Sequence, residues 1–146
     1  MQKAEQQINR FLVEVFNDVL RLEETSLSQG SCPDLSVSEV HVLEATQLCG
    51  DPPSMSTLAN RLRITAGTLT VAVKGLEQKG YLERRRCPED RRRVTVHLTD
   101  KADVALAHHA AFHEQMVHGV SEQLTEAQMQ ELVQTLDRLH TFFSGL

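Results

Sequence analysis

Local signals between residues 54 and 99 constrain the fold more than any other feature of this 146-residue sequence. A short helical pattern begins at Ser54 or Ser56, and a tight turn at 63–65 joins it to a second helical pattern. The second pattern ends at Lys79-Gly80, where the glycine supplies a left-handed C-cap. Two short helices this close in the chain are expected to cross steeply over one small shared core.

An alternating two-strand pattern follows the helix pair. Tyr81 to Arg84 predicts one strand, 85–90 a hairpin tip, and Val94 to Leu98 the returning strand. Six arginines lie on this hairpin: Arg84, Arg85, Arg86, Arg91, Arg92 and Arg93. Two helices followed by a basic hairpin predict a winged helix-turn-helix lobe over residues 36–99.

A further helix is expected just before the helix pair. Ser36 followed by Glu39 has the spacing of a capping box, in which each residue bonds the backbone N–H of the other. The run Gly50-Asp51-Pro52-Pro53 ends this helix, because it combines a flexible residue with two that lack a backbone donor.

Long amphipathic helices are expected on both sides of the lobe. Apolar residues recur at spacings of three and four within residues 5–27, and again after Thr125, whose spacing to Gln128 predicts an N-cap. Thr99 is expected to cap a helix over about 100–119. The expected fold class is therefore mainly α with a small β-wing.

Charge is distributed unevenly along the chain. The formal net charge is −5, yet residues 54–99 carry ten basic and four acidic residues, a local charge of +6. The rest of the chain carries −11. A concentrated basic segment is what a polyphosphate partner requires, and acidic flanks would repel DNA from the wrong surface.

Composition and cysteine spacing exclude several other classes. One Tyr, five Phe and no Trp make a stacking platform for single-stranded nucleic acid a poor candidate. No apolar run reaches membrane-spanning length, and the segment Met1 to Arg10 lacks the apolar core of a signal peptide, so we expect a cytoplasmic protein. Cys32, Cys49 and Cys87 form no CxxC pair and are expected to be reduced thiols, with a redox role for Cys87 among its arginines as the alternative.

The exposed face of the second short helix supplies the expected DNA contacts. Short polar side chains and a lysine at this face can enter a major groove, and hairpin arginines can reach a minor groove. The residues expected to serve DNA binding are Thr57, Thr65, Gly67, Thr68, Thr70, Lys74, Arg84, Arg86, Asp90, Arg91 and Arg92. The alternative is that the threonines only cap helices and that some arginines pair with Glu89 or Asp90.

The same residues resemble the MarR family of bacterial transcription factors. The resemblance is carried by Ser56-x-Leu58-Ala59-x-x-Leu62, by Gly67-Thr68-Leu69-Thr70-x-x-Val73-Lys74-x-Leu76-Glu77-x-Lys79-Gly80-Tyr81-Leu82-Glu83-Arg84, and by the wing Glu89 to Thr99. It implies one MarR-type domain over 1–146, with 1–35 and 100–146 as dimerisation arms. It also implies a homodimer on a pseudo-palindromic operator, with Asp90 bracing the wing against an arginine and Arg92 in the minor groove.

Other segments resemble the fatty-acid-synthesis repressor (FabT) subgroup of that family: Ile8-Asn9, Glu23-Glu24, Ser38-Glu39-Val40-His41, Gly67 to Thr70, and Phe112-His113-x-x-Met116-Val117. This resemblance implies that a long-chain acyl group on acyl carrier protein strengthens DNA binding. The ligand pocket would then lie between the lobe and the arms, lined by Phe16, Val19, Leu20, Val42, Leu106 and Phe112. The alternative for these six residues is ordinary packed core.

Zinc is the alternative effector. His109 and His113 are four residues apart on one helix, and imidazole and carboxylate groups suit tetrahedral zinc. By resemblance, Glu24, His41, His109 and His113 match the ligand positions of zinc-responsive MarR repressors. A second site of those repressors is incomplete here, because Val40 and His108 replace carboxylates. The alternative for these four residues is a buried polar network that binds no metal. His108, His118 and His140 are expected at the surface.

Two other function classes compete with a DNA-binding regulator. An enzyme would need a catalytic motif, and the sequence has no phosphate-binding glycine loop, GxSxG or HExxH, so we expect none. A winged helix that binds protein would not need a basic wing, and six arginines argue against it.

Overall fold

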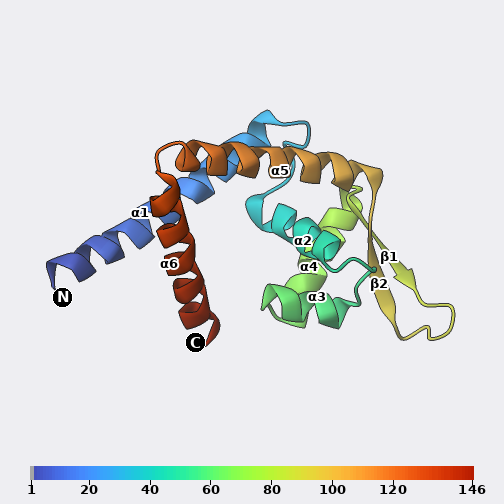
Figure 1. Cartoon of the computed structure of the whole chain (residues 1–146). Helices are drawn as coiled ribbons and strands as arrows, with labels where there is room; N and C mark the ends of the chain where they lie inside the picture. The colour runs from blue at the N-terminus through green and yellow to red at the C-terminus, as the bar shows by residue number, and fades with distance from the viewer. Residues whose placement is uncertain (1) are drawn as a thin grey trace. The chain divides into compact units, whose positions relative to one another are not determined.

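The computed structural model describes residues 2–146. Within that range the chain forms six helices and one two-stranded antiparallel sheet (Figure 1), which confirms the expected fold class. The elements are α1 (Lys3–Gln29), α2 (Val37–Leu48), α3 (Met55–Leu62), α4 (Ala66–Gln78), β1 (Leu82–Arg86), β2 (Val94–Leu98), α5 (Asp100–Ser121) and α6 (Glu126–Ser144).

Local capping chemistry explains where the helices begin. Each of Ser36, Ser54, Thr65 and Thr125 accepts, through its side chain, a hydrogen bond from the backbone N–H three residues on. The capping box predicted from Ser36 and the N-cap predicted at Thr125 are both confirmed.

Left-handed backbone explains where the helix pair turns and stops. The predicted stop after α4 is confirmed, because Gly80 has a φ of 85° that a side chain would strain. Arg63, in the turn between α3 and α4, also adopts a left-handed conformation, with a φ of 54°.

One core holds the helix-turn-helix lobe together. Leu58 of α3 and Leu69 and Val73 of α4 are fully buried, and Leu43 of α2 and Val96 of β2 close the same cluster. A fully buried Leu or Val side chain contributes about 1.5–3 kcal/mol. Because one apolar stripe of α4 is used in this core, the opposite face of α4 is left for solvent.

The β1–β2 hairpin is the wing. Leu82 pairs with Leu98 and Arg86 with Val94 at the two ends of the register. Figure 1 shows the hairpin loop extending beyond the helices α2, α3 and α4. A bridge between Ser54 and Thr95 joins the N-terminus of α3 to the hairpin, so the wing is held against the helix pair one residue from the loop end of β2.

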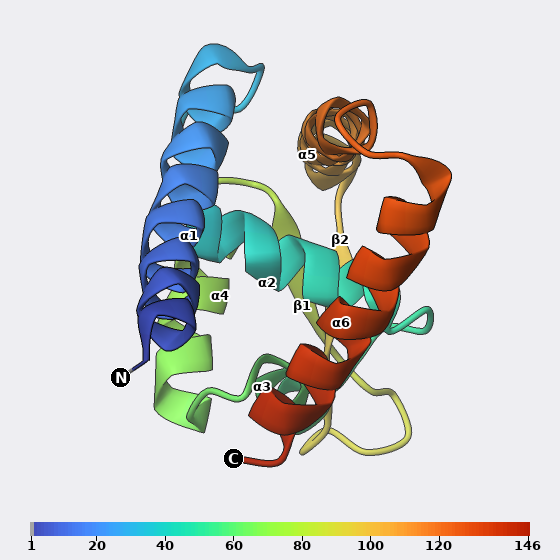
Figure 2. The ribbon, with the colours of Figure 1, turned by 60° about the vertical axis from the view of Figure 1, so that its left-hand side comes forward.

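The chain divides into two compact units, one ending at Ala110 and the other running from Ala111 to Leu146. The first unit contains the lobe and α1, and in it α1 contacts α2 (Figure 2). The boundary between the units falls inside α5, away from the boundaries at 35/36 and 99/100 expected for lobe and arms. The single MarR-type domain over 1–146 stays a prediction.

Both α1 and α6 expose apolar side chains. Of the 19 residues of α6, all of them described, none is buried. In α1 the apolar stripe predicted from the sequence ends at the buried Leu27, but Phe11 and Phe16 nearer the N-terminus are exposed. Neither helix, nor any other over residues 2–146, is long and apolar enough to cross a membrane.

Candidate nucleic-acid interface

The outward face of α4 carries the short polar residues expected from the sequence. Thr65 is the N-cap of α4, and its hydroxyl oxygen accepts the backbone N–H of Thr68 at 3.2 Å. The Thr65 hydroxyl also donates to the Thr68 hydroxyl at 2.9 Å. The capping alternative is therefore present, and it leaves the Thr68 hydroxyl hydrogen to donate elsewhere. Gly67 is exposed between them.

Two other threonines of the set predicted to contact DNA already form hydrogen bonds within the protein through their hydroxyl groups. The Thr70 hydroxyl donates to the Ala66 carbonyl 2.8 Å away, one turn earlier in α4. Thr57 lies on α3, where its hydroxyl accepts a bond from Ser54 at 2.9 Å. Both hydroxyl oxygens are exposed and keep acceptor capacity toward a ligand.

Cations without an internal partner flank this face. Over residues 2–146, Lys74 of α4 and Arg86, Arg91 and Arg92 of the wing make no side-chain ion pair or hydrogen bond. All four are exposed. Uncompensated positive charge at the surface of the lobe is what attraction of a phosphate backbone requires.

Arg84 is held differently from its neighbours. Its guanidinium bonds both carboxylate oxygens of Glu77, at 3.1 and 3.3 Å, and its backbone N–H bonds Glu77 at 2.9 Å. These bonds hold the pKa of Glu77 below its usual value and raise that of Arg84. The pair ties α4 to β1, so Arg84 serves the geometry of the interface from within the protein.

The other pairing of a wing arginine is also with a glutamate not foreseen as a partner. Arg85 bonds Glu83 at 3.0 Å, two residues away on the same strand. The sequence predicts Glu89 and Asp90 as partners, and the structure shows Glu77 and Glu83 instead. Glu77 comes from α4, so only the packing of α4 on β1 could reveal it.

Asp90 shapes the wing tip through the backbone. Its carboxylate accepts the backbone N–H of Arg92 at 3.0 Å, and its carbonyl accepts that of Arg93 at 2.9 Å. The tip is closed by a bond from the Cys87 N–H to the Arg93 carbonyl. Asp90 thus braces the turn that presents Arg91 and Arg92.

A cavity lies between the wing and the N-terminus of α3. Its volume is about 510 Å³. The residues that line it are Ser54, Met55, Ser56, Asp90, Arg92, Arg93 and Val94. Two arginines and two serines suit a phosphate or sugar better than an apolar ligand, and the Asp90 carboxylate is the one anion among these lining residues.

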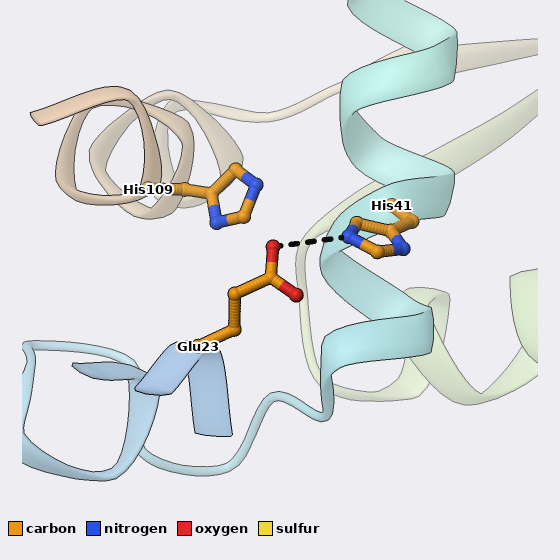
Figure 3. Close-up of side chains that lie close together, drawn as sticks. All are labelled: Glu23, His41 and His109. Atoms are coloured by element: carbon orange, nitrogen blue, oxygen red, sulfur yellow. Dashed lines mark hydrogen bonds and ion pairs between the residues drawn. The ribbon is translucent and has the colours of Figure 1, made fainter. Parts of the chain in front are cut away.

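A polar cluster lies elsewhere in the same unit (Figure 3). Glu23 of α1, His41 of α2 and His109 of α5 each offer one ligand atom, and these atoms all lie within 4.8 Å of one another. The Nε2 of His41 is 3.4 Å from the Glu23 Oε1. Glu23 and His109 are buried, whereas His41 is exposed. A carboxylate and two imidazoles are a donor set that zinc accepts.

The sequence predicts Glu24 as the α1 member of this group, and the structure places Glu23 there instead. Glu24 is exposed. The apolar stripe of α1 contains the signal for this difference, because Val19 and the buried Leu27 lie four residues to either side of Glu23. His113 lies in the other compact unit.

His108 is not the surface residue that the sequence predicts. It is half-buried, and its Nε2 lies 3.1 Å from the Ser26 hydroxyl and 2.9 Å from the Ser26 carbonyl. A methyl group at Gly30 would come within 2.8 Å of the same ring nitrogen. His118 and His140 are exposed, as expected.

The six residues predicted to line an acyl pocket differ in burial, and the pocket itself stays a prediction. Val42 and Leu106 are packed in the core of the first unit, whereas Phe16 is 74% exposed. Val19 is half-buried, Leu20 is exposed, and Phe112 lies in the second unit. For Val42 and Leu106 the packed-core alternative holds in this structure.

The three thiols are unpaired. Cys32 is buried in the core, and Cys49 and Cys87 are half-buried.

Comparison with known proteins gives consistent results. Residues 34–93 match the sequence profile of the MarR family. The crystal structure of Streptococcus pneumoniae FabT in complex with DNA superimposes with a TM-score of 0.90 and 33% identity, over 97% of this chain and 98% of that one.

Two curated relatives come from Bacillus subtilis (strain 168). The HTH-type transcriptional regulator MhqR is 32% identical over 96 residues, which are 63% of this chain and 66% of the relative. The HTH-type transcriptional regulator YkoM is 36% identical over 66 residues, 45% of this chain and 42% of that protein. The matched segments thus span less than two thirds of either relative.

Proposed function

Because the chain belongs to the MarR family of DNA-binding transcriptional regulators, we propose that it binds a pseudo-palindromic operator as a homodimer and represses transcription there. The family is not enzymatic, which confirms the prediction that this chain is no enzyme. One observation carries the proposal: the exposed face of α4 lies beside a wing whose Arg86, Arg91 and Arg92 have no internal partner.

The recognition step follows from this arrangement. α4 enters the major groove with Thr65, Thr68 and Lys74 toward bases and phosphates. The wing lies along the neighbouring sugar-phosphate backbone of the DNA and places Arg91 or Arg92 in the minor groove. The cavity at the N-terminus of α3 accommodates a backbone phosphate between the helix pair and the wing.

A second copy of the chain supplies the other half-site. The apolar side chains exposed on α1 and α6 support a dimer in which these helices pack against those of the partner. Two α4 helices must then lie about 34 Å apart to enter successive major grooves. Any ligand that changes this spacing changes affinity without a new base contact.

The test of DNA binding is charge reversal in the wing. The double variant Arg91→Glu/Arg92→Glu should bind a duplex selected from a random pool by the wild-type protein at least a hundredfold more weakly. The logarithmic salt dependence of its affinity should also be shallower, because fewer counterions are released. The control Arg10→Glu/Arg21→Glu changes the net charge equally on α1, away from the lobe. Unchanged binding by the wing variant contradicts the proposal.

For the effector we propose a long-chain acyl group presented by acyl carrier protein, acting as a corepressor. Support comes from the resemblance to FabT over nearly the whole chain. At fixed salt, acyl-loaded carrier protein should tighten operator binding tenfold or more, a coupling of about 1.4 kcal/mol. Unloaded carrier protein is the control, and equal affinity with both excludes this effector.

Zinc is the second candidate effector, favoured by the cluster of Glu23, His41 and His109. Three donors would leave a coordination position for a further ligand. Zinc binding, measured by competition with a chromogenic chelator, should be lost in His109→Ala and weakened in Glu23→Gln. The exposed neighbour provides the matched control Glu24→Gln, which should bind as wild type. Equal zinc affinity in all four proteins excludes this site.

A further inference from the structure

Val71 occupies an unusual position on α4. It is 74% exposed, among the most exposed large apolar side chains of the chain. Leu69 and Val73, two residues to either side of it, are fully buried. At 3.6 residues per turn, Val71 therefore lies about half a turn from the core stripe, at the point of α4 farthest from the protein.

Two of the neighbours of Val71 along this outer face have no side chains. Gly67 and Gly75 lie four residues before and after it, on the same side of the helix. A methyl group added at Gly67 would meet nothing within 4 Å, and one at Gly75 would meet only the Glu39 Oε1 at 3.8 Å. Packing within the protein therefore does not require either glycine.

Gly67, Val71 and Gly75 do not stabilise α4 as an isolated helix. Each glycine costs about 1 kcal/mol of helix stability relative to alanine, and a β-branched valine is also a weaker helix former. Together they give a helix face on which one apolar side chain, that of Val71, stands between two positions without side chains. Such a face lets another body approach the backbone of α4 closely and meet the isopropyl group of Val71 first.

We propose that Val71 is a specificity-determining residue that contacts the 5-methyl group of a thymine in each operator half-site. This inference rests on the proposed function, in which α4 enters the major groove. The unpaired cations of the lobe, Lys74 on α4 and Arg91 and Arg92 on the wing, favour DNA as the occupant over an apolar protein surface.

The chemistry of base edges selects thymine. In the major groove, guanine, adenine and cytosine offer hydrogen-bond donors and acceptors, and only thymine adds an apolar methyl group. An isopropyl group placed against the other edges removes water from polar atoms without replacing their hydrogen bonds. Val71 thus favours thymine by contact and disfavours the other bases by desolvation.

The experiment uses the full-length protein and operator duplexes selected from a random pool by wild-type protein. Each thymine is replaced in turn by deoxyuridine, which removes only the 5-methyl group. At one thymine in a half-site, the wild type should lose about fourfold in affinity, which corresponds to burial of one methyl group. Val71→Ala should bind thymine and deoxyuridine equally at that position, and its own selected sites should tolerate other bases there.

Two controls separate a specific contact from general damage. Val104→Ala removes the same atoms from another exposed valine, on α5, and should keep the wild-type response to deoxyuridine. Val71→Ala should unfold at the wild-type temperature or above it, because alanine is the better helix former.

The possible outcomes separate the proposed function from the proposed role of Val71. If wild-type protein selects no sequence from the pool, the proposed function fails. If it selects a site at which deoxyuridine is tolerated at every thymine, or at which Val71→Ala responds as wild type does, DNA binding stands and the role of Val71 is overturned.

Discussion

Single side chains decide how firmly the wing is attached to the recognition helix. Glu77 and Arg84 share two side-chain hydrogen bonds and one backbone bond, and each side chain is only about a third exposed, at 35% and 33%. The pair on the strand itself, Glu83 with Arg85, is more exposed and has no backbone bond. The first pair therefore joins two elements, whereas the second joins neighbours on one strand.

The change Glu77→Gln should weaken this attachment and alter the acid dependence of stability. The pKa of Glu77 is lowered in the folded protein, chiefly by the hydrogen bond from Arg84. Such a carboxylate stabilises the fold above its unfolded pKa, and this contribution is lost as pH falls through the folded value. We expect a loss of about 0.2–1 kcal/mol at pH 7 and a shallower decline of the free energy of unfolding below about pH 4.5.

Urea denaturation across pH 3–7 measures this effect. The matched control is Glu83→Gln, which removes the more exposed ion pair and should cost less stability at pH 7 than Glu77→Gln. Some acid dependence remains in Glu77→Gln, because the hydrogen bond from Tyr81 also lowers the pKa of Asp34. A wild-type profile for Glu77→Gln would contradict the role assigned to its ion pair.

His97 makes the free energy of unfolding depend on pH near neutrality. Desolvation lowers its pKa, with the positive charge of Arg85 as the next cause. The unfolded chain therefore takes up a proton first, and the free energy of unfolding should fall as pH drops below about 6.5. In His97→Gln the free energy of unfolding should change less between pH 7 and pH 5, as chemical denaturation can measure. The control His118→Gln replaces an exposed histidine of α5.

At the scale of elements, the helix pair depends on caps as much as on its core. Thr65 begins α4 with a side-chain bond to the Thr68 N–H, and Arg63 turns the chain just before it in a left-handed conformation. The end of α4 is set by Gly80. These local devices place the exposed face of α4 at a defined angle to the wing.

Removing the cap of α4 should destabilise the lobe. Thr65→Ala leaves the Thr68 N–H without its partner and should lower the free energy of unfolding by about 1 kcal/mol. Thr65→Ser keeps the hydroxyl oxygen and should stay within about 0.5 kcal/mol of wild type. Thermal or chemical denaturation compares the three proteins, and equal stability of all of them would show that the cap contributes nothing.

At the scale of the whole molecule, α1 and α6 expose apolar residues that a single chain does not bury. Leu136 on α6 is 50% exposed, and Phe142 and Phe143 near its end are exposed as well. Apolar side chains gathered on helices in this way favour assembly with a second copy.

A charge at Leu136 should therefore dissociate the proposed dimer. In Leu136→Glu the new carboxylate is exposed in the single chain, so the fold should survive while sedimentation shows monomers. Operator affinity should fall by more than a hundredfold, because one lobe then binds one half-site without its partner. Gln134→Glu adds the same charge on the opposite side of α6 and should stay dimeric. A dimeric Leu136→Glu protein would place the interface elsewhere.

Much of the fold and part of the site could be predicted from the sequence because their causes are local. A hydroxyl or carboxylate three residues from a backbone N–H marks a cap whatever surrounds it, as at Ser36 and Thr125. A glycine after a helical stripe stops it, as at Gly80, and alternation marks a strand, as in 94–98. The same local periodicity places Thr68 and Lys74 on the outside of α4.

Contacts between distant segments were decided only by the tertiary structure. The choice of Glu23 over Glu24 beside His41, the bond of His108 to Ser26, and the pairing of Arg84 with Glu77 depend on how helices pack. One residue along a helix is a rotation of about 100°, so a small error in assigning the buried stripe exchanges one side chain for its neighbour. The sequence by itself therefore determined the elements and the outward face of α4, while packing selected the partner of each charged group.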